Sequence, residues 1–459
     1  MNYNFNNKRT ESEKAANQLK QEKDAQNIKG ASDDKAKGNK IEKPAGYRLI
    51  KRRRDPVVMP EAKYDGAFDK ENPYYIKIAN KYRIMKYITI LLAVVFGLSM
   101  LTTYSTDITA ENFQYLIKDL DITGLTGDRN FGDIIYNGDS SSWFGIYRGE
   151  LIVVNSGSTM LYKPSGALSF EDANDFYNPR LSVSDKYFMV YDRGDTSYSY
   201  SVYNSFAELK NESFEFPITL AAISDEGSYA VVTRDDSYRS IVYYYDNDFK
   251  PINQIKKDKY VTALAFTNDG SKLAIASVYD KDGDFVAEIQ VIKGRSETAE
   301  FTITEDGLLP VNAKWLSNGN LCVLYSDCVV LYSPDGERIS SIDCSSCQSL
   351  KFSLGEELLV AVYNSTVLGY DKTVDIYDEN ADIKYTFECQ GDVISVKAQD
   401  KYICILFEDR VLRIDPIKGV IEVADVLPNA KDIVFYGDTV MICYAGVASP
   451  AVFNTQTVE

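Results

Sequence analysis

Hydrophobic and polar residues follow three different patterns along the 459-residue chain. Residues 1–46 contain almost no large apolar side chains, so they bury too little surface to offset the chain entropy lost on folding, and we expect them to be disordered. Residues 84–105 form one continuous apolar run. From Ser142 onward, short apolar segments alternate with polar turns, which is typical of β-strands.

The apolar run reads IMKYITILLAVVFGLSMLTTY and carries no charge between Tyr87 and Ser105. It approaches the ~20 residues that a helix needs to cross a bilayer. We therefore predict a transmembrane helix over 84–105, preceded by a disordered, basic tail over 1–83. A cleaved signal peptide is the competing interpretation, but the preceding segment is far too long for an n-region and no A-x-A-like site follows.

The β-rich part repeats one unit of apolar strand, turn with Asp or Gly, apolar strand, turn and apolar strand. Eight copies align on the first residue of their second strand. These residues are Leu151, Tyr187, Tyr229, Leu273, Leu321, Leu358, Tyr402 and Val440. Their intervals of 36 to 48 residues are close to the ~40 residues of a four-stranded propeller blade. We predict an all-β domain over 131–459, an eight-bladed β-propeller, with seven blades as the alternative if one weak copy is irregular.

The two ends of this domain complement each other. The last copy, from Asp432, supplies about three strands, and GDIIYN from Gly132 to Asn137 stands alone before the first copy. If GDIIYN is the outer strand of the final blade, the ring closes and no blade is left incomplete with an exposed edge.

A stem over 106–130 connects the apolar run to the propeller. Thr109 is a candidate N-cap, and the residues after it follow the helical spacing i, i+3, i+4, i+7. The apolar positions are Phe113, Leu116, Ile117 and Leu120. We expect a short amphipathic helix that caps the propeller. Docking to a partner or lying on the membrane surface are its alternative roles.

Charge divides the chain into two parts. Residues 1–86 hold 21 Lys plus Arg and 12 Asp plus Glu, a net +9, whereas the rest holds 29 and 55, a net −26, which together give the overall −17. Basic residues precede the apolar run and acidic residues follow it, so the positive-inside rule places the N-terminus in the cytoplasm and the propeller outside. The acidic outer domain argues against nucleic-acid binding, which requires clustered Lys and Arg.

The chain contains no histidine. This excludes Ser-His-Asp and Cys-His catalysis and histidine-ligated metals. Glycosidase chemistry needs only two carboxylates, but 55 acidic residues after position 86 single out no pair. We therefore assign no catalytic, cofactor-binding or metal-binding residue, and we expect a protein that is not an enzyme.

All seven cysteines lie in the predicted outer domain, at positions 322, 328, 344, 347, 389, 404 and 443. The spacing of the first four loosely resembles a zinc ribbon, but Cys322 and Cys328 fall on predicted strands. An extracytoplasmic domain permits disulfides, and Cys344 and Cys347 are close enough in sequence to pair. The odd total leaves at least one free thiol, and the βαβ context of a thioredoxin-like redox motif is missing.

Two further motifs have simple structural interpretations. Asp280, Asp282 and Asp284 superficially resemble a calcium loop, but Gly283 and Glu288 stand at the wrong positions for an EF-hand, and an Asp-Gly hairpin turn explains the same residues. The tyrosine-rich runs 196–203 and 243–245 are typical of side chains that pack across neighbouring strands. An aromatic surface for a sugar or protein ligand is the alternative.

The succession of strands and turns resembles the WD-repeat and quinoprotein-like propeller superfamilies over roughly residues 130–459, although the Trp-Asp and Gly-His dipeptides of WD repeats are absent. The layout of basic tail, single span, short helix and propeller also resembles an uncharacterised family of membrane-anchored propellers from Clostridia-like Gram-positive bacteria. That resemblance implies a fold and a location but no activity.

We predict a single-pass cell-membrane protein whose extracytoplasmic propeller is a non-catalytic binding or scaffolding module for an envelope protein or glycan. One alternative is a carboxylate-dependent glycan hydrolase, which a funnel with two close carboxylates, one with a raised pKa, would favour. The other is an envelope sensor that signals through the span to its basic tail. No cofactor is expected for any of these roles.

Overall fold

The computed structural model describes residues 73–103, 115, 132–139, 141–196, 198–294, 296, 298–399 and 402–456. The chain divides into two units, Met1–Asp107 and Ile108–Glu459, each of which is described by itself. The predicted disordered tail up to residue 72 and the predicted stem helix, apart from Tyr115, lie outside the described residues.

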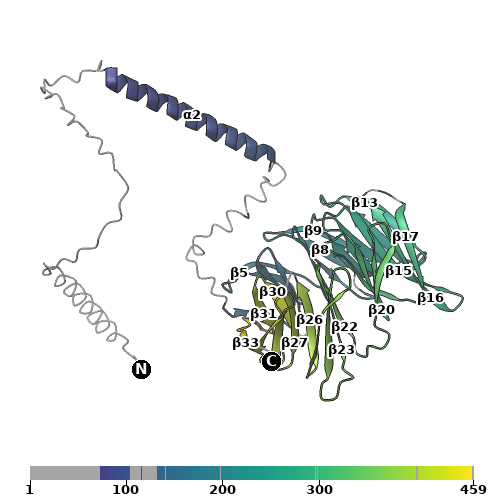
Figure 1. Cartoon of the computed structure of the whole chain (residues 1–459). Helices are drawn as coiled ribbons and strands as arrows, with labels where there is room; N and C mark the ends of the chain where they lie inside the picture. Colours follow the sequence, from purple (N-terminus) through teal and green to yellow (C-terminus); the bar gives the residue numbers. More distant parts are fainter. Residues whose placement is uncertain are drawn as a thin grey trace, which may run out of the picture. The chain divides into compact units, whose positions relative to one another are not determined.

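The first unit contains one described helix, α2, over Pro73–Thr103 (Figure 1). Proline is favourable in a first helical turn because its ring presets φ and its missing N–H has no intrahelical acceptor there. The helix begins inside the segment 1–83 that we assigned to the tail, so residue 83 is not a structural boundary. Its large apolar side chains are exposed, for example Leu91 at 62% and Phe96 at 68%. In the part of the chain that the structure describes, no helix has both the length and the apolarity that crossing a bilayer requires.

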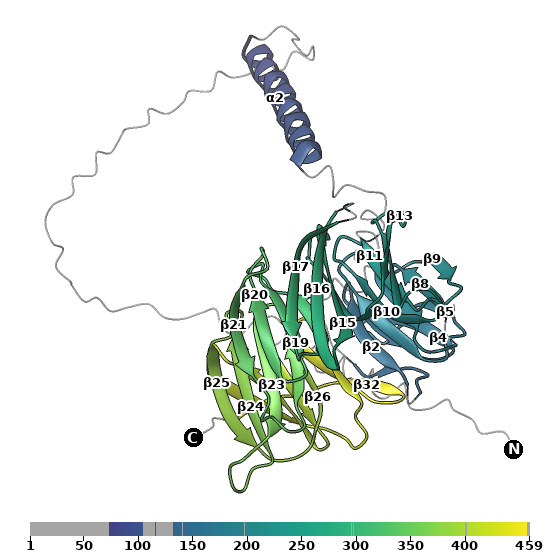
Figure 2. The same ribbon diagram turned by 90° about the vertical axis from the view of Figure 1, so that its right-hand side faces the viewer.

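The second unit is an eight-bladed β-propeller (Figures 1 and 2), which confirms eight blades rather than seven. Blade 1 contains β2 (Trp143–Tyr147), β3 (Glu150–Val154), β4 (Ser158–Tyr162) and β5 (Leu168–Ala173), and blade 2 contains β6 (Pro179–Val183), β7 (Phe188–Asp192), β8 (Ser199–Tyr203) and β9 (Glu208–Ser213). Blade 3 contains β10 (Ile218–Ile223), β11 (Tyr229–Thr233), β12 (Ser240–Tyr245) and β13 (Pro251–Lys257), and blade 4 contains β14 (Tyr260–Phe266), β15 (Lys272–Lys281), β16 (Asp284–Lys293) and β17 (Ala299–Asp306).

The remaining blades follow the same order. Blade 5 contains β18 (Pro310–Trp315), β19 (Leu321–Tyr325), β20 (Cys328–Tyr332) and β21 (Arg338–Asp343), and blade 6 contains β22 (Lys351–Leu354), β23 (Leu358–Asn364), β24 (Lys372–Asp378) and β25 (Ile383–Cys389). Blade 7 contains β26 (Val393–Gln399), β27 (Tyr402–Phe407), β28 (Arg410–Asp415) and β29 (Val420–Asp425), and blade 8 contains β30 (Asp432–Tyr436), β31 (Thr439–Cys443) and β32 (Val447–Pro450).

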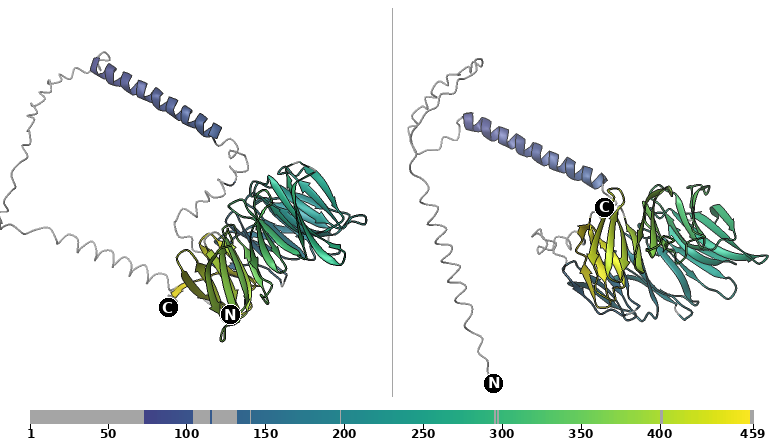
Figure 3. Two further views of the ribbon diagram at one scale, coloured as in Figure 1. Left: turned by 45° about the vertical axis from the view of Figure 1, so that its right-hand side comes forward. Right: turned by 60° about the horizontal axis from the view of Figure 1, so that its bottom comes forward.

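The N-terminal strand closes the ring as the sequence predicted. The strand β1 (Ile134–Ile135) pairs antiparallel with β32 and becomes the fourth strand of blade 8. The next residue, Tyr136, donates its backbone N–H to Gly446 O over 3.1 Å and its hydroxyl to Tyr444 O over 2.6 Å. The inner strands β30 and β2 are in contact, so the yellow C-terminal blade lies beside the blue first blade (Figure 3).

The C-terminal segment forms an additional strand that the sequence did not predict. After β32 the chain returns to the neighbouring blade, where β33 (Asn454–Gln456) pairs with β29 as a fifth strand. Phe453 packs against the hydrophobic cluster between blades 7 and 8, and the Arg413 guanidinium lies 4.3 Å from its ring centroid. The segment therefore covers the outer edge of blade 7 and ties the closing blade to its neighbour.

The core consists of eight buried hydrophobic clusters, one between each pair of neighbouring blades. This arrangement explains the sequence pattern of each blade. The second strands are mostly buried, and β3 and β7 are buried at every position, because both faces of the sheet pack against neighbouring blades. Fourth strands such as β9 alternate between exposed and partly buried residues because they lie at the rim.

The alternating strand directions place the connections on two faces of the ring. The face that we call the loop face carries the connections between the second and third strands of each blade and those that lead to the next blade. The face that we call the turn face carries the connections between the first and second strands and between the third and fourth strands.

Candidate functional site

Exposed large apolar side chains are distributed unequally between the two faces. Among the described residues, eleven of them lie on the loop face, namely Trp143, Tyr177, Tyr198, Tyr260, Phe285, Leu309, Val311, Val367, Leu368, Tyr370 and Leu427. By the same measure the turn face has six, namely Leu168, Val183, Phe206, Ile339, Ile383 and Ile417. Grouped exposed apolar side chains mark interaction sites more often than scattered ones. The loop face is therefore the first candidate for a binding surface.

Seven of the eleven residues belong to three consecutive blades, 4 to 6. We call six of them, all except Tyr260 at the start of β14, the apolar patch: Phe285, Leu309, Val311, Val367, Leu368 and Tyr370. Leu368 is 99% exposed and Phe285 is 60% exposed. Burying such side chains against a partner yields ~25 cal/mol per Å² of apolar area, which makes them costly to leave in water.

Backbone hydrogen bonds join the loops that carry the patch. Gly307 donates to Phe285 O over 2.7 Å, and Ser326 donates to Leu309 O over 2.9 Å. Further along the ring, Cys344 donates to Asp327 O over 2.8 Å, and Asn364 donates to Gln348 O over 2.9 Å. Each loop is thus fixed to the next, so the patch is held in place by the scaffold before any partner binds.

Carboxylates surround the apolar patch. On these loops the exposed acidic residues are Asp280, Asp282, Asp284, Asp306, Asp327, Asp343 and Asp371, whereas the exposed basic residues are Lys281 and Lys351. The patch is therefore an apolar surface in a negative rim, which attracts positively charged partners.

Tyr115, the one described residue of the predicted stem, lies on the turn face. The Tyr115 hydroxyl lies 3.2 Å from the Tyr147 hydroxyl and accepts the Ser205 N–H over 3.2 Å. The Arg148 guanidinium lies 3.9 Å from the centroid of the Tyr115 ring, and the Phe206 ring centroid lies 4.8 Å away. Tyr115 is buried among turns of blades 1 and 2.

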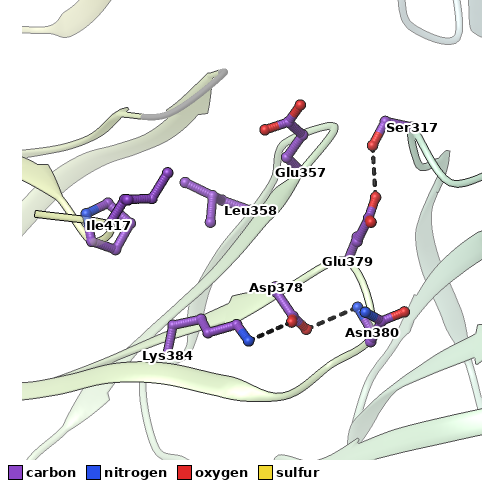
Figure 4. Close-up of a pocket in the computed structure, with 9 residues that line it drawn as sticks. Ser317, Glu357, Leu358, Asp378, Glu379, Asn380, Lys384 and Ile417 are labelled. Carbon is purple, nitrogen blue, oxygen red and sulfur yellow. Dashed lines mark hydrogen bonds and ion pairs between the residues drawn. The ribbon is translucent and has the colours of Figure 1, made fainter.

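A pocket of about 460 Å³ opens on the turn face between blades 5, 6 and 7 (Figure 4). It is lined by Ser317, Glu357, Leu358, Asp378, Glu379, Asn380, Lys384, Pro416 and Ile417. The Ser317 hydroxyl donates to Glu379 over 2.7 Å, and Lys384 forms an ion pair with Asp378 over 2.8 Å. Burial acts to raise the pKa of Asp378, but hydrogen bonds from Lys384 and from backbone N–H groups outweigh this effect and lower the pKa. This carboxylate is ionised and paired, unlike the proton donor of a glycosidase.

One carboxylate with a raised pKa lies elsewhere on the turn face, at the first turn of blade 3. Burial, together with the negative charge of Asp185, raises the pKa of Asp225. Asp225 accepts the backbone N–H of Asp185 over 3.3 Å. The charge of Glu356 also raises the pKa of Asp225, whereas that of Lys314 lowers it. A raised pKa is one part of the feature that we named for the hydrolase alternative. Nothing in the sequence singled out Asp185 and Asp225.

The cysteines are distributed among different blade interfaces. Cys328 packs towards blade 4, whereas Cys344 and Cys347 pack towards blade 6, so a sheet divides the cysteines whose spacing loosely resembles a zinc ribbon. Among the described residues, no group of Cys, Asp or Glu is arranged to hold a metal ion. Cys344 and Cys347 are free thiols on one turn, where the Cys347 N–H donates to Cys344 O over 2.9 Å. Their predicted disulfide remains a prediction.

The calcium-like motif is a hairpin turn. Lys281 pairs with Asp284 across β15 and β16, which leaves Asp282 and Gly283 as the two turn residues. Their φ values are 58° and 98°, the positive values that a tight hairpin turn requires and that an Asp-Gly pair tolerates. This confirms the simpler interpretation.

Most residues of the tyrosine runs are buried between strands. Tyr200 and Tyr203 have no exposed area, and Tyr245 stacks on Tyr229 with ring centroids 4.6 Å apart. The Tyr200 hydroxyl donates to Glu212 over 2.8 Å. Cross-strand packing therefore accounts for these residues, and Tyr198 alone in the two runs contributes a large exposed side chain to the loop face.

Comparisons with known proteins place the chain in a fold but give no activity. A family model described as "Family of unknown function (DUF5711)" matches residues 136–443. No curated protein matches the chain. Solved structures that are similar to it include three propellers. Sqt1 from Saccharomyces cerevisiae is 9% identical with a TM-score of 0.50, and the match covers 70% of this chain and 100% of that one. BamB from Moraxella catarrhalis is 12% identical with a TM-score of 0.48, covering 70% of this chain and 98% of that one. The β-propeller domain of Cps50 (Swd1) from Myceliophteria thermophila is 10% identical with a TM-score of 0.43, covering 60% of this chain and 96% of that one. The likeness to Sqt1 agrees with the propeller fold and carries no function with it.

Proposed function

Because the chain belongs to the DUF5711 family of unknown function, its own surfaces must indicate its role, and we propose that it is a membrane-anchored, extracytoplasmic binding module without catalytic activity. The observation that carries this proposal is the apolar patch on the loop face, whose side chains are exposed on a rigid, closed ring. Propeller rings of this kind commonly serve as binding scaffolds, and rigid loops lose little entropy on binding.

The anchoring part of the proposal rests on the segment 84–105. It is apolar, its N-terminal flank is basic and its C-terminal flank is acidic. Within the described residues of their unit, 73–103, the side chains of α2 such as Leu91 and Phe96 are exposed, and a lipid environment would solvate them favourably.

Topology is tested with a membrane-impermeant maleimide on intact cells. We expect labelling of the Leu368→Cys variant on the loop face and none of a Ser32→Cys variant in the basic tail, with the unsubstituted chain as the control for its seven cysteines. Labelling of Ser32→Cys, or of neither variant, would contradict the proposed orientation.

The binding role is tested in the same cells with an impermeant crosslinker. A reproducible attached protein that disappears in a Leu368→Asp variant supports the module. A matched control is Ile417→Asp, because Ile417 is 81% exposed but lies on the turn face. Equal loss with both variants would show that the apolar patch is not the binding surface.

Asp225 and Asp185 favour one second candidate, a carboxylate-dependent hydrolase of cell-wall glycans. That role predicts release of reducing ends from purified cell wall by the wild-type chain and a loss of at least about a hundredfold in Asp225→Asn, since the raised pKa of Asp225 would suit a general acid. We expect no release above background from either chain.

A further inference from the structure

We infer that the apolar patch binds a protein segment whose apolar side chains are flanked by lysine or arginine. The inference deepens the proposed function and rests on it. It names the chemical class of the partner.

The charge of the rim selects among possible occupants. Seven exposed aspartates and two exposed lysines lie on the loops around the apolar patch. Anionic lipid headgroups would be repelled by such a rim. A segment with basic residues next to its apolar ones can bury its apolar side chains against the patch and pair its charges with the acidic rim. The charge attraction chiefly raises the rate of association.

The shape of the surface suits an extended or helical segment rather than a small molecule. The patch runs over three consecutive blades, and its loops are hydrogen-bonded to one another. The blade 6 loop is also closed on itself, because Ser365 donates to Asp371 O over 3.0 Å and Gln390 donates to Gly369 O over 2.8 Å. Val367, Leu368 and Tyr370 are thus presented on a fixed loop.

The test is site-specific photo-crosslinking of the full chain in its own membrane. A benzoyl-phenylalanine replaces Leu368 in one strain and Ile417 on the turn face in another. We expect a protein adduct at position 368 only, and mass spectrometry of the attached peptide should show apolar residues within a few positions of lysine or arginine. An attached peptide without basic residues, or equal adducts at 417, would overturn the inference.

A second pair of variants separates the apolar and charged contributions. With the crosslinker at Val311, Leu368→Ser should lower the adduct yield by about tenfold or more, as expected for a central contact residue. Changing Asp280, Asp282 and Asp284 to Asn keeps a favourable Asn-Gly hairpin turn, and it should lower the yield severalfold and weaken its dependence on salt. Unchanged yield in both variants would overturn the partner chemistry.

The failure of the inference can be distinguished from failure of the proposed function. A lipid or a glycan adduct at position 368 would overturn the protein partner, yet either would leave an anchored binding module. The absence of any adduct together with no maleimide labelling of Leu368→Cys would overturn the proposed function itself.

Discussion

Lys257 provides the most quantitative test of the structure, because it is a buried amine between blades 3 and 4. Its side chain is 5% exposed, and Nζ donates to Gln290 Oε1 over 2.6 Å and lies 3.7 Å from Glu288 Oε1. Glu288 also pairs with Lys259. Burial lowers the pKa of Lys257 to about 8, even though Glu288 acts in the opposite direction. Replacing Lys257 with Met removes a buried charge and leaves Glu288 with a partner.

The expected gain follows from the pKa difference. A decrease from 10.5 to about 8 corresponds to roughly 3 kcal/mol of destabilisation of the charged form. Loss of the hydrogen bond to Gln290 costs about 1 kcal/mol. We therefore expect Lys257→Met to raise the free energy of unfolding by about 2 kcal/mol at pH 7.

The pH dependence gives the sign of the effect. Between pH 8 and 10.5 the unfolded chain binds more protons at Lys257 than the folded chain does, so the stability of the wild type rises with pH in this window. The advantage of Lys257→Met should be constant below pH 8 and should shrink by up to about 1.4 kcal/mol per pH unit above it.

The assay is urea unfolding of the full chain in detergent, followed by tyrosine fluorescence and circular dichroism from pH 6 to 10.5. Lys250→Met is the matched control, because the Lys250 side chain is 71% exposed and should change stability little. A wild type that is more stable than Lys257→Met at pH 7, with a gap that does not change up to pH 10, would refute the reasoning.

Three further predictions concern the backbone, the C-terminal strand and the cysteines. Gly336→Ala should destabilise the fold at least about twice as much as Gly283→Ala in thermal unfolding, because both have positive φ but a Cβ at Gly336 would lie 2.5 Å from Phe301 whereas Gly283 has open space. Ending the chain after residue 452 should lower stability by about 2 kcal/mol through loss of β33 and the Phe453 contacts; a shortened chain that unfolds at the wild-type urea concentration would contradict the role of this segment. The predicted pairing of Cys344 with Cys347 requires an oxidising compartment. In chain isolated from cells under acid trapping, a disulfide between them should lower the mass of the peptide by two hydrogens. Recovery of both thiols fully alkylated would contradict that pairing.

The blades could be predicted from sequence because a physical constraint repeats in each of them. Every second strand is packed on both sides, so it reads as a continuous apolar run, and these runs recur at blade spacing. Ring closure could be predicted for the same reason, since Ile134 and Ile135 supply the strand that blade 8 lacks. The Asp282-Gly283 turn was also readable, because few dipeptides accept two positive φ values.

Features that depend on long-range contacts could not be predicted. The strand β33 consists of Asn454, Thr455 and Gln456, which carry no strand signal, and it forms only because β29 offers an unpaired edge. Leu368 and its neighbours resemble a strand in sequence, and only the fold shows that they form an exposed loop. The raised pKa of Asp225 arises from turns that are about 40 residues apart along the chain, since Asp185 and Asp225 meet only in the folded ring.

The same division between core and loops explains why the loop face can be tested without unfolding the protein. The stabilising clusters lie between blades, and each contains residues from the strands of two neighbours. None of the six residues of the apolar patch belongs to a cluster. Changing a 99% exposed side chain such as Leu368 should therefore alter unfolding by less than about 0.5 kcal/mol while removing a binding contact. A Leu368→Ser variant that lost both its crosslink and its stability would show instead that the loop supports the ring, and the apolar patch would then need a structural explanation.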